Sequence, residues 1–148
     1  LERAAAGGIA VVGGHPLAGH DGSGFGTARA GLFRDTAFAL LPVTDVPEVI
    51  DALLADLGAR PLVVDAATHD RALARTSHLP YLVACALREL GDAAAAHGLA
   101  GPGFRDMTRL AASDPRMAGA YCRANAGEVA AAWRELAERM EKRIAGLS

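Results

Sequence analysis

Hydrophobic and polar positions divide the chain into two parts with different periodicity. The first 65 residues alternate short apolar runs with glycine-rich loops, whereas residues 66–148 carry apolar positions at spacings of three and four. Short uninterrupted apolar runs bounded by glycine or proline are typical of strands buried on both faces. Three such runs predict strands at residues 9–12, 36–41 and 62–64.

Between the second and third runs the spacing becomes that of a helix. The apolar stripe there comprises Val49, Ile50, Leu53, Leu54 and Leu57. Asp45 is expected to cap this helix, with Pro47 in its first turn and Gly58 at its end. With a glycine-rich loop up to Gly26 and a short helix at 27–33, the first part is predicted to run strand, loop, strand, helix, strand.

Residues 66–148 predict helices alone. A long helical stretch at 68–96 is interrupted by Pro80, which lacks an N–H group and is expected to kink it. The later boundaries are a loop at 101–103, a short helix ending near Ala112, and a helix capped by Asp114 with Pro115 at its first position.

The last helix carries a long apolar stripe, made up of Val129, Trp133, Leu136, Met140 and Ile144. A stripe of this length has to be buried. Because a helical region of about eighty residues buries proportionally little surface by itself, we expect a second copy of the chain to cover the stripe in a homodimer.

Two domains follow from these patterns. Residues 1–65 are predicted to form the second half of an α/β sheet, and residues 66–148 an all-helical domain. Residues 1–6 are typical of the last turn of a helix closed by Gly7 and Gly8, so the chain is expected to start in mid-fold.

Composition and charge narrow the function classes. Apolar residues make up 51% of the chain and its formal net charge is −2, so we expect no nucleic-acid partner and favour a small neutral or anionic metabolite. The apolar runs are too short to span a bilayer and no signal-peptide pattern is present, which indicates a cytoplasmic protein without membrane association. Cys85 and Cys122 fall within predicted helices and are expected to be buried thiols.

His15 is the first candidate for chemistry. It follows a predicted buried strand, and ligands bind beyond the carboxyl ends of strands in open α/β sheets. Gly13 and Gly14 would let a ligand approach the backbone closely. An imidazole can accept a proton from a substrate hydroxyl as a hydride leaves. The alternative is a loop histidine that bonds its own turn.

Two later segments carry further candidates. Ser77 and His78 precede the expected kink at Pro80, where a bent helix can open a pocket, although His78 could equally pack against a neighbouring helix. Arg109 offers a planar guanidinium for a carboxylate, or is a solvated helix arginine. Arg105 and Asp106 are expected to order the loop or to pair with each other, and the histidines show no metal-ligand spacing, so no metal is expected.

In order and spacing, three segments resemble the prephenate/arogenate dehydrogenase family, the oxidative decarboxylases of tyrosine biosynthesis. The segments are Gly13-Gly14-His15-Pro16, Ser77-His78-Leu79-Pro80 and Phe104-Arg105-Asp106-Met107-Thr108-Arg109. The resemblance implies that His15 accepts the proton of the ring hydroxyl and that Arg109 binds the ring carboxylate. It also implies that Ser77, His78 and Tyr81 shape a substrate pocket between two domains.

The chain departs from the family pattern at two positions. Tyr81 stands where the family commonly has a second histidine, and it keeps a hydrogen-bonding tip without the option of positive charge. His20 stands where relatives often have serine or threonine. The segment Gly22-Ser23-Gly24-Phe25-Gly26 lacks the strand and spacing of a phosphate-binding motif and is predicted to be a flexible loop.

The resemblance implies that residues 1–65 end a Rossmann-like nucleotide-binding domain and that residues 66–148 form a helical dimerisation and substrate domain. The substrate would be prephenate or arogenate and the cofactor NAD or NADP, with Gly13 and Gly14 as cofactor contacts and tyrosine as a possible effector. The Gly-x-Gly-x-x-Gly fingerprint is absent from this sequence, so we expect a piece of the enzyme that is inactive alone. The alternatives are a non-catalytic helical dimeric ligand-binding module and a related dehydrogenase for another cyclohexadiene acid.

Overall fold

The computed structural model describes residues 6–8, 11–19 and 24–147. The chain divides into two compact units, residues 1–69 and residues 70–148. Three sequence predictions lie wholly or partly outside the described residues: the helix end at 1–6, the strand start at 9–10, and the positions of His20, Gly22 and Ser23.

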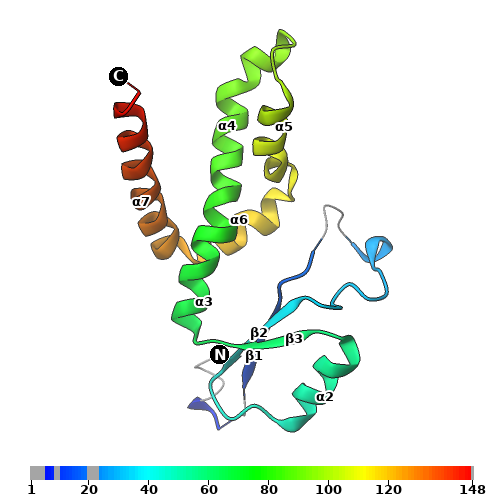
Figure 1. Cartoon of the computed structure of the whole chain (residues 1–148). Coiled ribbons are helices and arrows are strands. Elements are labelled where there is room, and N and C mark those ends of the chain that lie inside the picture. Colours follow the sequence, from blue (N-terminus) through cyan, green and yellow to red (C-terminus); the bar gives the residue numbers. More distant parts are fainter. Residues whose placement is uncertain (1–5, 9–10, 20–23, 148) are drawn as a thin grey trace. The chain divides into compact units, whose positions relative to one another are not determined.

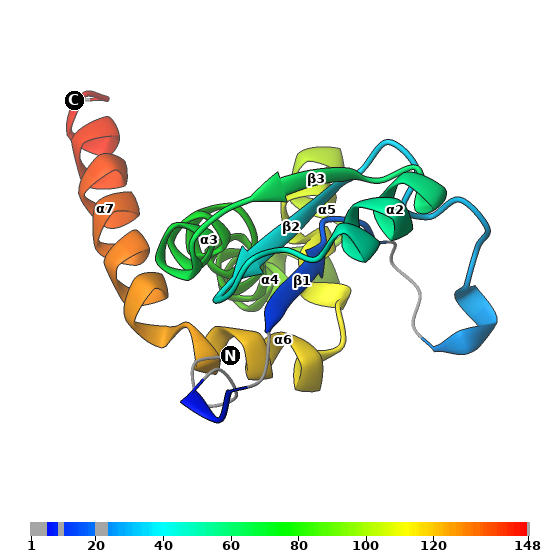
Figure 2. The same ribbon diagram turned by 90° about the horizontal axis from the view of Figure 1, so that it is seen from below.

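Unit 1 contains a three-stranded sheet in the order β1-β2-β3 (Figures 1 and 2). Its elements are β1 (Val12–Pro16), the 3₁₀ turn η1 (Phe25–Thr27), β2 (Ala37–Pro42), α2 (Glu48–Leu57) and β3 (Arg60–Val63). This order of strand, loop, strand, helix and strand confirms the pattern predicted from hydrophobicity. β2 pairs antiparallel with β1 and parallel with β3.

The first strand lies further along the chain than predicted. Residues 9–12 were expected to form it, with His15 in the following loop, but β1 runs through Gly13, Gly14 and His15 to Pro16. The apolar pattern missed this because glycine has no side chain and normally weakens a strand signal. At Gly14 a Cβ would lie 2.9 Å from Cε1 of Phe38 on β2, so a larger residue here would have to displace the Phe38 ring.

One face of the sheet is covered by α2. Leu54 of α2 is 2% exposed and packs with Leu40 of β2 and with Ala59 in the main core of this unit. Gly58 ends α2 in the left-handed conformation, with φ of 67°. This confirms the predicted helix end and brings the chain directly back into β3.

Two local predictions in unit 1 were wrong. Asp45 does not cap α2, because Pro47 occupies the cap position and has no side-chain capping bond. Residues 27–33 form no helix beyond the short turn η1, since Gly31 has a φ of 76° that a right-handed helix cannot contain.

The predicted helices account for most of unit 2. Its elements are η2 (Ala74–His78), α4 (Leu79–Ala96), α5 (Pro102–Thr108), the 3₁₀ turn η3 (Arg109–Ala112), α6 (Pro115–Ala124) and α7 (Ala126–Ala145), and α3 (Ala66–Leu73) leads into it. The interruption expected near Pro80 is a π-helical turn, η2, in which the Leu79 N–H donates to the Ala74 carbonyl five residues earlier. The turn widens because Pro80 has no N–H to offer the preceding carbonyls.

α5 and α6 begin at prolines. The residues at 101–103 were expected to form a loop, but α5 already starts at Pro102. Asp114 caps α6 as predicted, and its Oδ1 accepts a hydrogen bond of 2.8 Å from the Arg116 backbone N–H. That bond is the main cause that lowers the pKa of Asp114.

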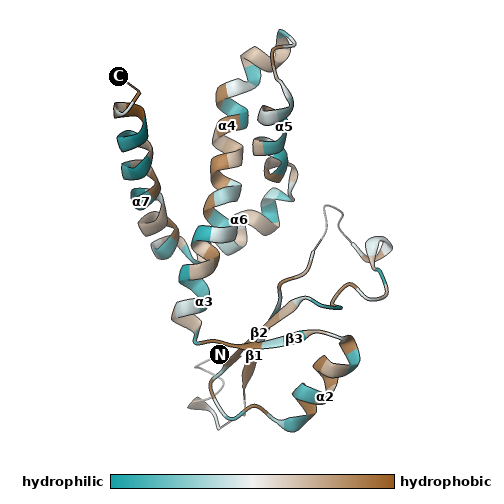
Figure 3. Cartoon of the chain, in the orientation of Figure 1, coloured by the Kyte–Doolittle hydropathy of each residue, from teal (hydrophilic) through white to brown (hydrophobic). Residues whose placement is uncertain are grey.

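The apolar stripe of α7 is only partly covered within one chain. Val129 and Ala132 join Ala74 and Leu79 in the buried core of unit 2, whereas Trp133 is 54% exposed. Met140 and Ile144 are exposed too, so one chain alone does not bury the whole stripe, and its burial by a second copy stays a prediction. Figure 3 shows hydrophobic and hydrophilic residues side by side along α7. Within the described residues, no helix is long and apolar enough to cross a membrane.

Candidate functional site

His15 is held in the middle of paired β-structure. Its cross-strand partner is Ala39 of β2, and successive side chains of a strand point to opposite faces of the sheet. The Phe38 and Leu40 side chains contribute to the core under α2, so His15 and Ala39 lie on the other face. The expectation that His15 follows a buried strand was therefore wrong, because His15 lies within β1 itself.

His15 is joined to a second histidine, His69. The Nδ1 atom of His15 lies 2.9 Å from Nε2 of His69, and the two rings meet edge to face at 69° with centroids 5.2 Å apart. Both rings are partly buried. Sequence reasoning considered His69 only as a possible metal ligand. The one sequence signal for His69 was its position near the start of the helix that follows β3.

The surroundings favour the neutral form of the His15 imidazole. Burial lowers the pKa of His15 below its usual value, and the neighbouring His69 lowers it further. A neutral imidazole has one nitrogen lone pair that can accept a proton. Because Nδ1 is used by His69, Nε2 is the atom of His15 left for a ligand.

His78 is fixed by the junction of α6 and α7. It is 7% exposed, and its Nδ1 lies 3.2 Å from the Asn125 amide nitrogen, which also donates to the Asp70 carbonyl at 2.7 Å. An amide nitrogen is a donor only, so Nδ1 of neutral His78 accepts and its proton is on Nε2. Sequence reasoning missed Asn125, which ends one helix and starts the next.

Tyr121 connects the two aromatic candidates of this unit. Its ring stacks on His78 at a centroid distance of 4.7 Å and contacts Tyr81 edge to face at 6.4 Å. A hydrogen bond with the Cys85 thiol, together with burial, raises the pKa of Tyr81. The structure thus brings His78 and Tyr81 together through Tyr121, which sequence reasoning did not single out.

Ser77 and Arg109 occupy exposed positions. Ser77 lies in the π-helical turn η2 immediately before the buried His78. Arg109 is the first residue of the 3₁₀ turn η3. Before it, Thr108 ends α5, and its hydroxyl donates a hydrogen bond to the Phe104 carbonyl. Arg105 donates to the Ala100 carbonyl at 2.9 Å, a contact that orders the loop before α5.

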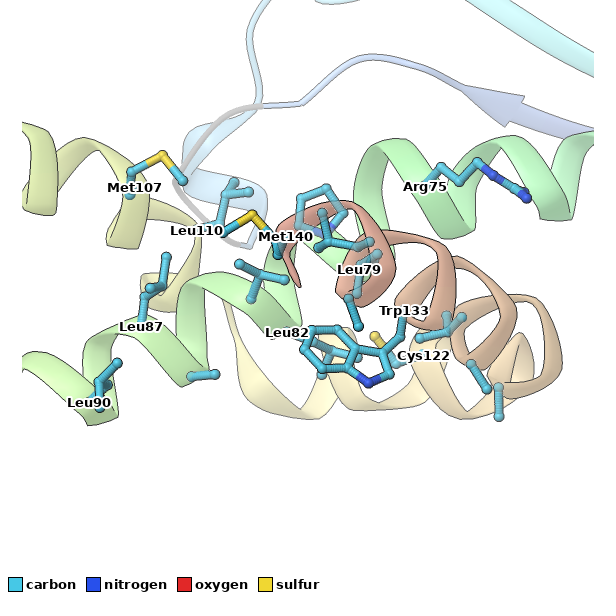
Figure 4. Close-up of a pocket in the computed structure, with 18 of the residues that line it drawn as sticks. Arg75, Leu79, Leu82, Leu87, Leu90, Met107, Leu110, Cys122, Trp133 and Met140 are labelled. Carbon is cyan, nitrogen blue, oxygen red and sulfur yellow. The ribbon is translucent and has the colours of Figure 1, made fainter. Parts of the chain in front are cut away.

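An apolar groove of about 1330 Å³ runs along unit 2 between α4, η3 and α7. Figure 4 shows its lining side chains, which come from several helices. They include Leu79, Leu82, Leu110, Trp133, Leu136 and Met140. Four charged residues also line it, namely Arg75, Asp106, Arg109 and Arg123. The groove can therefore accept a mainly hydrophobic surface that also carries charge.

The Phe38 ring fills the space where a side chain at Gly14 would stand, so close packing against β2 accounts for glycine at this position. No group of three or more histidine, cysteine or carboxylate side chains that could hold a metal ion occurs among the described residues.

Comparison with known proteins identifies the family. The family described as "Prephenate dehydrogenase, dimerization domain" matches residues 65–147, more than half of the chain. A prephenate dehydrogenase from Lactococcus lactis subsp. cremoris is 35% identical over 114 residues, which make up 74% of this chain and 31% of that relative. The chain thus spans about a third of the length of this curated relative.

Solved structures agree with the sequence matches. Arogenate dehydrogenase from Synechocystis superposes with a TM-score of 0.74 at 30% identity, covering 90% of this chain and 52% of that one. Prephenate dehydrogenase from Aquifex aeolicus, in complex with hydroxyphenyl propionate and NAD+, gives 0.76 at 26% identity, covering 88% and 49%. By the family match and these likenesses, the chain belongs to the prephenate dehydrogenase family.

Proposed function

We propose that the protein containing this chain oxidises and decarboxylates prephenate or arogenate in tyrosine biosynthesis, with NAD or NADP as hydride acceptor, in the cytoplasm. One observation carries the proposal: the histidine of the Gly-Gly-His-Pro segment is partly buried and bonded through Nδ1 to His69, so that Nε2 is left for a substrate, and its surroundings lower its pKa. Family membership supplies the reaction class.

His15 acts as the proton acceptor in this proposal. A base must be unprotonated at the working pH, and the lowered pKa of His15 keeps it so near neutrality. As the ring hydroxyl becomes a carbonyl, its proton moves to Nε2 of His15. Loss of the ring carboxylate as carbon dioxide then makes the ring aromatic, which drives the reaction.

A nicotinamide dinucleotide supplies the hydride acceptor when bound. Gly13 and Gly14 stay predictions as its contacts, and Gly14 fits this role less well than the sequence suggested because Phe38 fills its Cβ space. Residues 1–65 as the end of a Rossmann-like nucleotide-binding domain, and residues 66–148 as the dimerisation and substrate domain, are part of the same proposal. We expect this chain alone to be inactive.

The substrate contacts of unit 2 are assigned by chemistry. Arg109 receives the ring carboxylate, since a guanidinium binds it in a planar, bidentate manner. His78 presents an N–H at Nε2 because Asn125 occupies its Nδ1. Ser77 and Tyr81 complete the proposed contacts. The Tyr81 hydroxyl is bonded to Cys85, so Tyr81 contributes mainly the edge of its ring.

We also propose that the chain forms a homodimer through the apolar groove. The family match names a dimerisation domain, and Trp133, Met140 and Ile144 leave apolar surface exposed on α7. Large contiguous apolar surfaces left exposed on a protein commonly mark interaction sites. Tyrosine, which shares the phenol and carboxylate of the product class, is the proposed effector.

Turnover by the full-length protein tests the function. It should reduce NAD or NADP with prephenate or arogenate and release carbon dioxide in equal amount. Binding of the product-like hydroxyphenyl propionate without turnover of either acid would favour the non-catalytic ligand-binding module. Turnover only with a different cyclohexadiene acid would favour the related dehydrogenase.

A further inference from the structure

The pair of His15 and His69 contains one hydrogen-bonding proton. Their facing nitrogens are 2.9 Å apart, a distance that needs one N–H group and one lone pair between them. Two protons would bring two donors face to face, and none would bring two lone pairs together. One of the two imidazoles therefore donates this proton and the other accepts it.

The state of Nε2 of His15 shows which of the two histidines donates. A neutral imidazole carries its proton on one nitrogen and its lone pair on the other. If His69 donated, His15 would hold its own proton on Nε2 and could accept nothing there. If His15 donates from Nδ1, its Nε2 keeps a lone pair for a substrate hydroxyl.

We propose that His69 is a positioning residue that accepts the hydrogen bond from Nδ1 of His15 and so keeps the Nε2 lone pair of His15 for the substrate. His69 also takes the Nδ1 proton once Nε2 has been protonated. This inference rests on the proposed function for its direction.

The proton balance of the proposed step is simple. The O–H bond of the substrate hydroxyl breaks and an N–H bond forms at Nε2 of His15, while the oxygen keeps its electron pair. The N–H bond at Nδ1 of His15 then breaks and an N–H bond forms at Nε2 of His69. His15 returns to a neutral form and the positive charge is on His69.

Few other charges lie on the neighbouring elements. β2 has no titratable side chain between Ala37 and Pro42, and the Arg60 guanidinium of β3 donates to the Asp35 carbonyl. Immediately before α3, Asp65 accepts from the Thr68 N–H at 2.8 Å, and on α3 Asp70 and Arg71 follow His69 in the sequence. On β1 and β2, His15 therefore meets no carboxylate that could set its tautomer in place of His69.

The tautomer can be read from this chain without substrate or cofactor. Long-range proton–nitrogen NMR at about pH 8 distinguishes the two neutral forms of each imidazole, and a His15→Asn spectrum assigns the His15 signals. We expect the Nδ1–H form for His15. The Nε2–H form in the wild-type chain would overturn the proposal, because His69 would then be the donor.

Two substitutions separate the two roles of His69. His69→Gln offers an amide oxygen that can accept from Nδ1 but cannot take a proton, so His15 should keep its Nδ1–H form. His69→Phe offers no acceptor, and His15 should change to the Nε2–H form that free histidine favours. An unchanged tautomer in His69→Phe would show that another group sets it.

Kinetics of the full-length protein test the transfer to His69. Orienting partners of functional histidines are worth roughly 10- to 100-fold, so we expect His69→Phe to lower kcat by that factor with KM values changed less than about threefold. His69→Gln should keep the tautomer and still lose turnover, and wild-type kcat in this variant would overturn the proton transfer. His97→Gln, at an exposed helix-end histidine bonded to the Ala93 carbonyl, is the matched control.

The two proposals fail separately. An absence of turnover by the wild-type full-length protein would contradict the proposed function and leave the NMR result as it stands. A wrong tautomer combined with normal turnover would contradict the role of His69, and with it proton transfer to Nε2 of His15, and would leave the proposed reaction standing.

Discussion

The amide nitrogen of Asn125 bridges two segments by donating both to Nδ1 of His78, at 3.2 Å, and to the Asp70 carbonyl, at 2.7 Å. Both hydrogens of one amide group are thereby used. The bridge holds the buried His78 ring against Tyr121 and ties the residue between α6 and α7 to α3. A single side chain thus sets both the orientation and the tautomer of His78.

We expect Asn125→Ala to destabilise the protein by about 1 to 3 kcal/mol, because it leaves the His78 Nδ1 atom and the Asp70 carbonyl without this donor. Urea unfolding measures the loss. Asn125→Asp should be at least as damaging, since a carboxylate cannot donate to either acceptor. Wild-type stability in both variants would show that water replaces the amide at no cost.

Trp133→Asp should dissociate the proposed dimer. Trp133 lines the apolar groove and is half exposed in one chain, so a partner would bury it, and a carboxylate there would be strongly unfavourable. Light scattering should give a dimer mass for the wild type and a monomer mass, or an unfolded chain, for the variant. Leu99→Asp changes an exposed leucine outside the groove and should leave the mass unchanged. A wild-type monomer at all concentrations would contradict the dimer.

Stability should fall on acidification in a way that depends on His15. Burial and His69 lower the pKa of His15 in the folded protein, so the unfolded chain binds a proton more readily. The stability that the neutral His15 ring contributes is fully present above the ordinary histidine pKa of about 6.5. It is lost as the pH falls from that value through the lowered pKa of the folded protein. Urea unfolding at about pH 7.5 and 5.5 should show a smaller drop for His15→Asn than for the wild type. Equal drops would mean that His15 titrates normally.

Arg109 should govern substrate affinity in the full-length protein. Hydrogen bonds to a charged group are worth about 1.5 to 3 kcal/mol, so Arg109→Ala should raise the KM for the cyclohexadiene acid by roughly 10- to 100-fold. Arg109→Lys should recover part of this, because lysine keeps the charge and loses the planar fork.

Arg105→Ala is the control for Arg109, since Arg105 is bonded to the Ala100 carbonyl and should affect KM little. A large effect of Arg105→Ala together with none of Arg109→Ala would show that the proposal assigns the substrate carboxylate to the wrong arginine.

The sequence was sufficient to predict helix boundaries that depend on neighbouring residues. Asp114 and Pro115 start α6, Gly58 ends α2, and Pro80 interrupts the long helix, each for a reason that acts within a few residues. The family was also predicted correctly, because the resemblance rested on three motifs in a fixed order.

The error in the position of β1 came from residues whose partners are distant in sequence. Gly13 and Gly14 look like a loop, and only their pairing with β2 makes them a strand. Local periodicity also did not show that Trp133, Met140 and Ile144 of α7 stay exposed among the described residues. Neither relationship can be predicted from local periodicity.

The site was incomplete for the same reason. His69 is separated from His15 by 54 residues and Asn125 from His78 by 47. Neither belongs to a motif, so only the folded structure could show these two partners of the candidate histidines.

The most direct test of the account is turnover of the full-length protein carrying His15→Asn. Asparagine preserves hydrogen bonding and cannot act as a base near neutral pH. If His15 accepts the hydroxyl proton, kcat should fall by on the order of 10² to 10⁴ with little change in the affinity for NAD or NADP. A kcat within about threefold of the wild type would show that His15 only stabilises β1, and the proposed mechanism would be wrong.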